Sequence, residues 1–286
     1  MTPPSVLITG ASTGIGEACA LRMAERGWRV FAGVRQPGDG ERLDSRGGGR
    51  IVSLILEVTD EASIRAAMVQ VQAVVGTDGL RGLVNNAGIA VSGPMEYVAS
   101  AELRRQFEVN VFGLVAVTQA ALPLLRPVRG RIVNMASIAG RVTSPLMGPY
   151  AASKHAVEAI SDALRLELAA DGVEVSVIEP GVIRTPIWEK AKSASDAWLA
   201  AMPIEGRQRY AWLIKAVTNV VEKQGPRGAP PSVVADAVEH ALTAPSPRAR
   251  YLVGEGVKVR AWLKLLPERW MDRIVLDRLR KFADRS

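Results

Sequence analysis

Cysteine, histidine and long apolar runs are scarce in this sequence, and each scarcity removes a class of protein. Cys19 is the only cysteine among 286 residues, so no disulfide can form within the chain, which fits a reducing cytoplasmic setting. The two histidines, His155 and His240, are too few and too scattered to build a Cys/His metal site. No apolar run reaches the roughly 18 residues of a membrane span, and the first residues lack the basic and apolar regions of a signal peptide. We therefore expect a cytoplasmic protein without a metal site.

The charge is one-sided but spread along the chain. Lys and Arg number 36 against 29 Asp and Glu, for a formal net charge of +7. Such a surface is simply soluble and basic, or it attracts the phosphate groups of a cofactor, a membrane or a nucleic acid. A nucleic-acid partner is not expected, because the cations form no stripe with stacking aromatic residues and belong to no known binding module.

Apolar segments typical of strands alternate with segments of helical periodicity through most of the chain. This alternation predicts an α/β fold, in which a doubly wound parallel sheet of about seven strands carries helices on both faces, in one domain over residues 1–286. Gly38, Gly40 and the glycines at 47–49 predict a loop-rich connection after the second strand. The expected strands are 5–9, 28–34, 51–56, one beginning at 83–85, 131–136, 173–178 and 251–253, and the expected helices are 14–26, 61–75, 100–125, 150–170 and 232–243.

A glycine-rich turn joins the first strand to the first helix. It reads Thr9-Gly10-Ala11-Ser12-Thr13-Gly14-Ile15-Gly16. Glycine lets the chain turn sharply and lets the backbone approach a ligand. The free N–H groups and the partial positive charge of a helix N-terminus then suit a pyrophosphate. The spacing differs from the common dinucleotide pattern G-x-G-x-x-G, and the alternative is a glycine turn without a ligand.

Further motifs follow this turn in order along the chain. They are Asn85-Asn86-Ala87-Gly88 after the fourth strand, Asn110 in the next helix, Ser137 after the fifth strand, Tyr150 with Lys154, and Pro180-Gly181 with Thr185. With the turn they span residues 9–185, and over this span the sequence resembles the short-chain dehydrogenase/reductase family. Segments 30–35 and 263–275 are similar, more weakly, to its retinol and 17β-hydroxysteroid dehydrogenases. The resemblance implies a Rossmann-type fold that binds NAD or NADP, commonly in a homodimer or homotetramer.

The resemblance also assigns the cofactor contacts. The second strand ends on Arg35 without an acidic residue, which favours NADP(H) over NAD(H), because a cation attracts the 2′-phosphate that an acid repels. The alternative is that Arg35 is a solvated surface charge, and Thr13 stands where the family often has a second basic residue. Glu57 replaces the family's usual aspartate near the adenine. The expected cofactor-binding residues are Gly10, Ser12, Thr13, Gly14, Ile15, Gly16, Arg35, Glu57, Val58, Asn86, Ala87, Gly88, Tyr150, Lys154, Pro180, Gly181, Val182, Ile183 and Thr185.

Tyr150 and Lys154 are the expected catalytic pair, since a spacing of four residues places them on one face of a helix. The pKa of a free tyrosine, about 10, is too high for a base near neutrality. A nearby ammonium and the positive nicotinamide ring of oxidised cofactor favour the phenolate and lower that pKa, so Tyr150 can exchange a proton with the substrate oxygen. By resemblance, Lys154 also holds the nicotinamide ribose, Ser137 binds the substrate oxygen, and Asn110 positions a water that links Lys154 to solvent. The hydride moves to or from the nicotinamide.

The chain is less regular after Pro186. Trp and Met residues within 188–212 either line an apolar substrate pocket or pack a lid, expected at about 186–231, onto the core. The segment 257–286 is amphipathic, with nine Lys or Arg and four Asp or Glu. It suits a helix on the body, a contact between subunits or a peripheral membrane anchor. The expected substrate is a secondary alcohol or ketone on a bulky apolar molecule, of the steroid or retinoid kind.

Other functions compete with this one. An NADP-sensing regulator without turnover would keep the glycine turn, but it would not need Asn110, Ser137, Tyr150 and Lys154 together. An NAD(H)-dependent alcohol dehydrogenase of the same family differs only in its cofactor. The joint presence of the four polar residues therefore favours an NADP(H)-dependent oxidoreductase.

Overall fold

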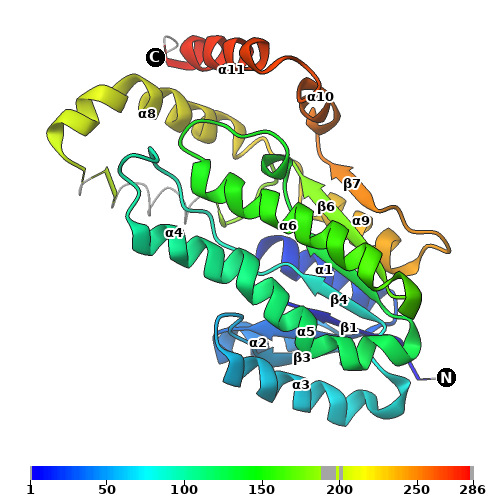
Figure 1. The fold of residues 1–286 in the computed structure, drawn as a ribbon. Helices are drawn as coiled ribbons and strands as arrows, with labels where there is room; N and C mark the ends of the chain where they lie inside the picture. Colours follow the sequence, from blue (N-terminus) through cyan, green and yellow to red (C-terminus); the bar gives the residue numbers. More distant parts are fainter. Residues whose placement is uncertain (1, 188–197, 200–201, 284–286) are drawn as a thin grey trace.

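Seven parallel strands form one sheet between two layers of helices (Figure 1). The structure is a computed structural model and describes residues 2–187, 198–199 and 202–283. The strand order β3-β2-β1-β4-β5-β6-β7 confirms the doubly wound α/β fold, because the chain starts in the middle of the sheet and extends it first to one side and then to the other. The strands are β1 Ser5–Ile8, β2 Arg29–Val34, β3 Ile51–Ile55, β4 Gly82–Asn85, β5 Arg131–Met135, β6 Glu174–Pro180 and β7 Arg250–Val253.

Helices α1 and α9 cover one face of the sheet, and α3, α5 and α6 cover the other (Figure 1). A π-helical turn, Glu108–Phe112, joins α4 to α5, and a short 3-10 helix, η4, spans Ile138–Gly140. The α-helices are α1 Gly14–Glu25, α2 Pro37–Arg46, α3 Glu61–Val75, α4 Ser100–Phe107, α5 Gly113–Leu125, α6 Gly148–Glu167, α8 Ile204–Gln224, α9 Ser232–Thr243, α10 Val257–Leu263 and α11 Glu268–Ala283.

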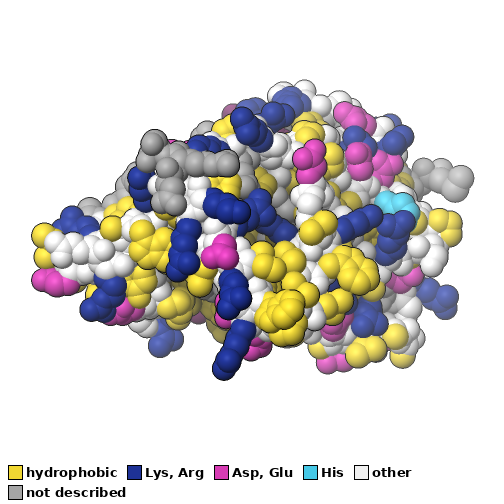
Figure 2. Space-filling model, turned by 90° about the horizontal axis from the view of Figure 1, so that it is seen from above, with side chains coloured by type: hydrophobic (Ala, Val, Ile, Leu, Met, Phe, Trp, Pro, Cys, Tyr) yellow, Lys and Arg dark blue, Asp and Glu magenta, His cyan; other side chains and the backbone are white. Residues whose placement is uncertain are grey.

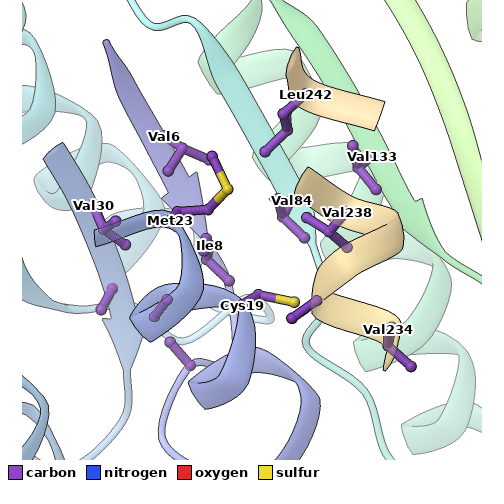
Figure 3. Close-up of a cluster of buried hydrophobic side chains, with 14 of the residues drawn as sticks. Val6, Ile8, Cys19, Met23, Val30, Val84, Val133, Val234, Val238 and Leu242 are labelled. Atoms are coloured by element: carbon purple, nitrogen blue, oxygen red, sulfur yellow. The ribbon is translucent and has the colours of Figure 1, made fainter. Parts of the chain in front are cut away.

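The two helical layers bury the strands on both faces. On one side, Cys19 and Met23 of α1 and Val238 of α9 lie over Ile8 and Val84 of the central strands (Figure 3). Burial on both faces explains why these strands read as continuous apolar runs rather than as an alternation of apolar and polar residues. Burial also raises the pKa of the Cys19 thiol to about 12, so this cysteine acts as a small apolar core residue.

The connection after β2 contains a helix, α2, where the glycines predicted a loop. Pro37 occupies the first turn of α2, where a missing N–H costs nothing, and Leu43 is fully buried against the core. A Cβ at Gly40 would lie 2.5 Å from Ser53 Oγ. At least this glycine therefore marks close packing of the helix on β3 rather than a turn, which is why the loop prediction was wrong.

One helical stretch, Ser100–Val128, is long and apolar enough to cross a membrane by length and composition, although the sequence reading found no such run. Half of its apolar window is buried inside the protein. Val117, Ala121 and Leu125 pack with α3 and the sheet, in the core on the face of the sheet that α3 and α5 cover. An apolar stretch of this kind is also what a core helix requires, and here it fills the space between α3 and the sheet.

The region after Pro186 is more regular than its sequence suggests. It contains α8, a helix of 21 residues that contacts α11. The hydroxyl of Tyr210 on α8 donates a hydrogen bond of 2.9 Å to Glu96, and Met202 just before α8 is buried. These contacts join the region to the connection between β4 and α4. Much of the expected lid, 188–197 and 200–201, lies outside the described residues.

Candidate active site

A cleft opens beyond the carboxyl ends of β1 and β4, the central strands from which the sheet is extended in opposite directions. In doubly wound sheets this edge is where ligands bind. Most of the residues expected to bind cofactor or to react lie on its wall, while Gly16, Asn110 and Val182 do not. The expected residues that line it are Gly10, Ser12, Thr13, Gly14, Ile15, Arg35, Glu57, Val58, Asn86, Ala87, Gly88, Ser137, Tyr150, Lys154, Pro180, Gly181, Ile183 and Thr185.

The glycine turn is held in shape by the loop that follows β4. Gly10 and Gly14 have φ values of +63° and +64°, which side chains rarely tolerate. Thr9 Oγ1 accepts hydrogen bonds from the backbone N–H groups of Asn86 and Ala87, at 3.0 and 2.9 Å. The Asn86 side chain donates to the carbonyls of Thr9 and Gly10, both at 3.0 Å. The turn is thus preformed, and the N-terminus of α1 faces the space where a pyrophosphate fits.

Gly16 and Val182 do not line the cleft, but both stabilise segments that do. A Cβ at Gly16 would meet the Asn86 side-chain nitrogen at 2.5 Å, so this glycine lets α1 approach the turn closely. The Val182 carbonyl accepts a hydrogen bond of 3.0 Å from Ala229 N–H, and Arg184 N–H donates to the Ala229 carbonyl at 2.9 Å. The nicotinamide contact expected of Val182 stays a prediction, while its carbonyl already fixes the segment after β6.

Two cations lie at the end of the cleft where β2 finishes. Arg35 is 68% exposed at its side chain, and its Nη1 is 3.8 Å from Glu57 Oε2. The Glu57 carboxylate also accepts hydrogen bonds from the N–H and hydroxyl of Thr59, at 3.2 and 3.0 Å. Arg42, on the unexpected helix α2, donates a hydrogen bond to the Ser12 carbonyl in the glycine turn. Arg42 was not predicted to lie near the cofactor, because its segment was expected to form a loop.

Asn110 lies in the π-helical turn between α4 and α5 and is buried. Its Oδ1 accepts a hydrogen bond of 2.9 Å from Ile89 N–H, and its Nδ2 donates to the Ile89 carbonyl at 3.0 Å and to Ser153 Oγ at 3.1 Å. Gln106, which the sequence reading missed, bonds the same loop through the Val91 N–H at 2.6 Å and the Ile89 carbonyl at 2.9 Å. Both amides therefore clamp the loop after β4, and Asn110 ties it to the catalytic helix α6.

Ser137, Tyr150 and Lys154 meet at the floor of the cleft. Tyr150 and Ser137, which follows β5, both line the cleft, and the Ser137 side chain acts on the pKa of the Tyr150 hydroxyl. Lys154 is buried, and its Nζ donates a hydrogen bond of 2.7 Å to the Met135 carbonyl. An ammonium has three N–H donors, so the remaining two can reach the hydroxyls of a cofactor ribose. The arrangement can pass a proton between a substrate oxygen and Tyr150 beside a fixed cation.

Burial dominates the ionisation of this group. Burial raises the pKa of Tyr150, and the hydrogen bond with Ser137 opposes this rise. Burial lowers the pKa of Lys154 to about 8, against the opposing charge of Glu158. The expectation joined the ammonium of Lys154 to the positive ring of oxidised nicotinamide, and the protein's own groups alone hold the pKa of Tyr150 above its ordinary value. The positive ring of oxidised nicotinamide remains as a source of the charge that favours the phenolate.

A buried cluster of charges lies behind the catalytic helix and was not expected. Glu179 is fully buried at the end of β6, and Arg141 Nη2 donates to its carboxylate at 2.6 Å. Arg250 of β7 joins Glu179 at 3.5 Å to Glu158 at 3.2 Å and Asp162 at 2.6 Å, both on α6. Glu158 is one helical turn beyond Lys154. The sequence signal was the charged Glu179 directly after the apolar Val177 and Ile178 of β6.

The side of the cleft towards α8 is apolar. Ile89 and Ile187 line it. The carbonyl of the buried Leu146 accepts a hydrogen bond of 2.7 Å from Gly93 N–H. Leu146 has φ +65°, a strained value that is uncommon for a leucine and that marks the loop before α6 as constrained. Trp198 packs against Gly93. Among the described residues, Trp198 packs on this loop and Tyr210 of α8 packs against Tyr97, whereas Trp212 is exposed and Ile89 and Ile187 line the cleft.

Comparisons with known proteins agree with this geometry. A sequence profile described as short chain dehydrogenase matches residues 4–196. The chain is 40% identical to the NADPH-dependent 3-dehydrocapnine reductase of Ornithobacterium rhinotracheale, covering 98% of this chain and 99% of the relative. It is 36% identical to retinol dehydrogenase 5 of Mus musculus, covering 94% and 87%.

Solved structures show the same fold. A short-chain dehydrogenase from Streptomyces avermitilis superposes with a TM-score of 0.75 at 25% identity, covering 97% of this chain and 95% of the other. A short chain dehydrogenase/reductase from Burkholderia phymatum, in complex with NAD, superposes with a TM-score of 0.79 at 24% identity, covering 96% and 95%. The second similarity supports the fold alone.

Proposed function

This chain belongs to the short-chain dehydrogenase/reductase family, and we propose that it uses NADP(H) to interconvert a ketone and a secondary alcohol on a bulky apolar molecule. As a member of the family it is an NAD(P)-dependent oxidoreductase that acts on the CH–OH group of donors. The observation that carries the reaction is the placement of Ser137, Tyr150 and the buried Lys154 on the wall of one cleft. Ser137 and Tyr150 would bind the substrate oxygen, and Tyr150 would exchange its proton. The bound nicotinamide supplies the hydride chemistry.

The preference for NADP(H) rests on Arg35 and Arg42 at the adenosine end of the cleft. Arg35 lines the cleft at the end of β2, and Arg42, which is ion-paired with Glu17, reaches the Ser12 carbonyl from α2. A guanidinium is well suited to bind a 2′-phosphate, because it presents several donors in one plane. Arg35 Nη1 lies 3.8 Å from Glu57 Oε2, and the Arg35 side chain is 68% exposed. Arg35 can therefore turn from Glu57 towards a phosphate. A relative that is 40% identical over its whole length carries "NADPH-dependent" in its name, which supports the same choice.

The apolar substrate is supported by the wall of the cleft and by the names of two relatives. Ile89 and Ile187 line the side where the substrate would enter. One relative is named as a reductase of 3-dehydrocapnine and another as a dehydrogenase of retinol. Reduction and dehydrogenation are the two directions of one hydride transfer, so both names are compatible with one cleft.

Initial rates with NADPH and NADH test the cofactor proposal. Wild type is expected to show the higher kcat/KM with NADPH. Arg35→Gln should lower kcat/KM for NADPH by roughly tenfold to a hundredfold, because a charge-assisted contact is lost, and Arg42→Gln by less. Arg50 is an exposed arginine before β3, and Arg50→Gln is the control. It should leave kcat/KM for NADPH and for NADH unchanged. A wild-type kcat/KM with NADH that equals or exceeds the value with NADPH would overturn the proposal. Steroid and retinoid ketones and alcohols, followed by nicotinamide absorbance, test the substrate.

A further inference from the structure

The C-terminal helices expose large apolar side chains that a water-facing surface rarely shows together. Trp262 is 71% exposed, Leu265 74%, Trp270 67% and Val259 66%. Val259, Trp262 and Leu265 follow one another at intervals of three residues, and Leu265 N–H donates to the Trp262 carbonyl, so the three share one side of α10 and its last turn. Figure 2 shows apolar side chains gathered on the face formed by α10 and the start of α11.

Cations without carboxylate partners accompany these apolar residues. Lys258, Lys264, Arg269 and Arg273 are exposed. Among the described residues no carboxylate lies within ion-pair distance of these four, whereas most exposed arginines on the α1, α3 and α4 surfaces are paired. The four cations with Val259, Trp262, Leu265 and Trp270 are called the tail surface below. Figure 2 shows Lys and Arg side chains beside the apolar group.

The tail surface begins at the active site. Val257, the first residue of α10, is fully buried, and its Cγ2 would lie 2.5 Å from a Cβ placed on Gly181, a residue of the cleft wall. Gly181 N–H donates a hydrogen bond of 2.8 Å to the Val253 carbonyl at the end of β7. Helix α10 also contacts η4, which follows Ser137 directly. The first turn of the exposed helix is therefore fastened to the wall of the cleft, and its outer side faces away from the protein.

We propose that the tail surface docks the protein onto a bilayer that contains anionic lipids. Tryptophan and leucine insert at the boundary between headgroups and acyl chains, and lysine and arginine beside them bind anionic headgroups. The charge favours a bilayer over a second copy of this chain. Glu268 and Asp272 are also exposed beside the four cations, so two tail surfaces brought face to face would still set eight cations against four carboxylates. An acidic headgroup layer supplies both the opposite charge and the apolar layer beneath it.

Docking in this way would place the substrate side of the cleft next to the bilayer. The helix that carries Trp262 packs on Gly181 through Val257, so the exposed Val259 and Trp262 lie within about two helical turns of the cleft wall. An apolar ketone or alcohol partitions into lipid, and this protein would then meet its substrate at the membrane surface. This consequence rests on the proposed substrate class, while docking itself depends only on the tail surface.

Sedimentation of the full-length protein with vesicles tests the docking. The vesicles are phosphatidylcholine with and without phosphatidylglycerol, and no cofactor or substrate is present. The apolar variant is Trp262→Gln with Trp270→Gln, and the charge variant is Lys264→Gln with Arg269→Gln. The control is Arg65→Gln with Val69→Gln on α3, two exposed residues on the far side of the molecule from the tail (Figure 1). Thermal unfolding midpoints near that of wild type establish that each variant is folded.

Wild type and the control are expected to sediment with the anionic vesicles and to be released by salt. The apolar variant should bind both vesicle types at least about tenfold more weakly. The charge variant should lose roughly tenfold in affinity for the anionic vesicles. Wild type that stays in the supernatant with both vesicle types overturns the proposal, and so does a control that loses as much binding as the variants.

Sedimentation velocity without lipid separates docking from self-association. If the apolar variant dissociates an oligomer that wild type forms, the tail surface is a contact between copies and the proposal is overturned. Oligomeric state unchanged by the variant supports docking. Because vesicle binding is measured without turnover, docking can fail while ketone reduction succeeds, and docking can succeed while the cofactor or substrate proposal fails.

Discussion

The cofactor part of the chain, up to Thr185, and the part from α8 onward use their side chains in opposite ways. In the first part, polar side chains such as Thr9, Asn86 and Asn110 turn inward and bond the backbone of neighbouring loops. In the second part, Trp262 and Trp270 turn outward with few internal partners. Side chains that satisfy buried backbone groups are replaceable by few other residue types, so they leave readable motifs. Side chains that face the surroundings of the protein are not constrained in this way.

The largest expected effect concerns one tyrosine from each part. Tyr150→Phe should lower kcat by about a thousandfold, since it removes the group that exchanges a proton with the substrate oxygen. Tyr210→Phe removes a hydroxyl on the surface of α8 that donates a hydrogen bond to Glu96. The kcat of this variant should stay within about twofold of wild type. Steady-state rates and cofactor titrations by fluorescence check both variants. Equal losses in the two would erase the distinction between the two parts, and an active Tyr150→Phe would contradict the proposed proton transfer.

The same distinction explains what the sequence could predict. The doubly wound parallel sheet could be predicted from alternating strand and helix segments, because buried parallel strands must be apolar on both sides. The cleft-lining Ser137, Tyr150 and Lys154 could be named because the order of their motifs is specific. Helix α2 was missed because Gly40 looks like a turn in sequence, and only its packing on Ser53 shows why a glycine is there. A local pattern carries no information about a contact thirteen residues away.

Contacts between distant segments also explain the other failures. Arg141 and Glu179 are 38 residues apart, and their pairing depends on how η4 meets the end of β6. Burial raises the pKa of Tyr150, and the degree of burial is set by the whole cleft. Helix α8 was missed because its surroundings in sequence showed no clear periodicity. Packing, desolvation and the surface of the C-terminal part are properties of the assembled chain, so the sequence reading left them open.

A second comparison sets a buried ion pair against an exposed one. Arg141→Met leaves the carboxylate of Glu179 buried with only Arg250 nearby, at 3.5 Å, and should lower the free energy of unfolding by about 3 kcal/mol. Arg209→Met breaks an exposed pair with Glu96 on α8 and should cost less than about 1 kcal/mol. Urea unfolding followed by circular dichroism measures both. A loss for Arg209→Met as large as that for Arg141→Met would show that α8 is as tightly built as the catalytic part.

Two glycines with left-handed backbones give a third comparison. Gly10 has φ +63°, and an added Cβ would lie 2.8 Å from Ala87 Cα, so Gly10→Ala should cost about 2 kcal/mol from backbone strain and this close contact together, and should also weaken cofactor binding. Gly256, before α10, has φ +68° with nothing near its Cβ position. Gly256→Ala should cost about 1 kcal/mol and leave the KM for cofactor unchanged. Urea unfolding and KM values are the measurements, and a raised KM in Gly256→Ala would connect the two parts more closely than the structure indicates.

The smallest effect at neutral pH is expected at Glu158, behind Lys154. Burial, helped by the charge of Glu179, raises the pKa of this carboxyl from 4.5 to about 7 against the pull of Arg250 and Arg141. The folded protein therefore favours the protonated carboxyl. The stability gained in this way is complete below pH 4.5 and is lost as the pH rises through about 7. The Glu158→Gln side chain cannot ionise. Its free energy of unfolding should therefore fall less than that of wild type between about pH 5 and about pH 8, a range that contains the raised pKa.

Urea unfolding of wild type and Glu158→Gln across this pH range decides the point. The matched variant in the C-terminal part is Glu205→Gln on the exposed first turn of α8, which should follow the wild-type curve. If wild type instead gains stability over Glu158→Gln as the pH rises, the ion pair of Glu158 with Arg250 at 3.2 Å outweighs burial. The charge cluster would then stabilise the ionised carboxylate one turn from Lys154, and the ammonium of Lys154 would keep its proton to higher pH than burial alone allows.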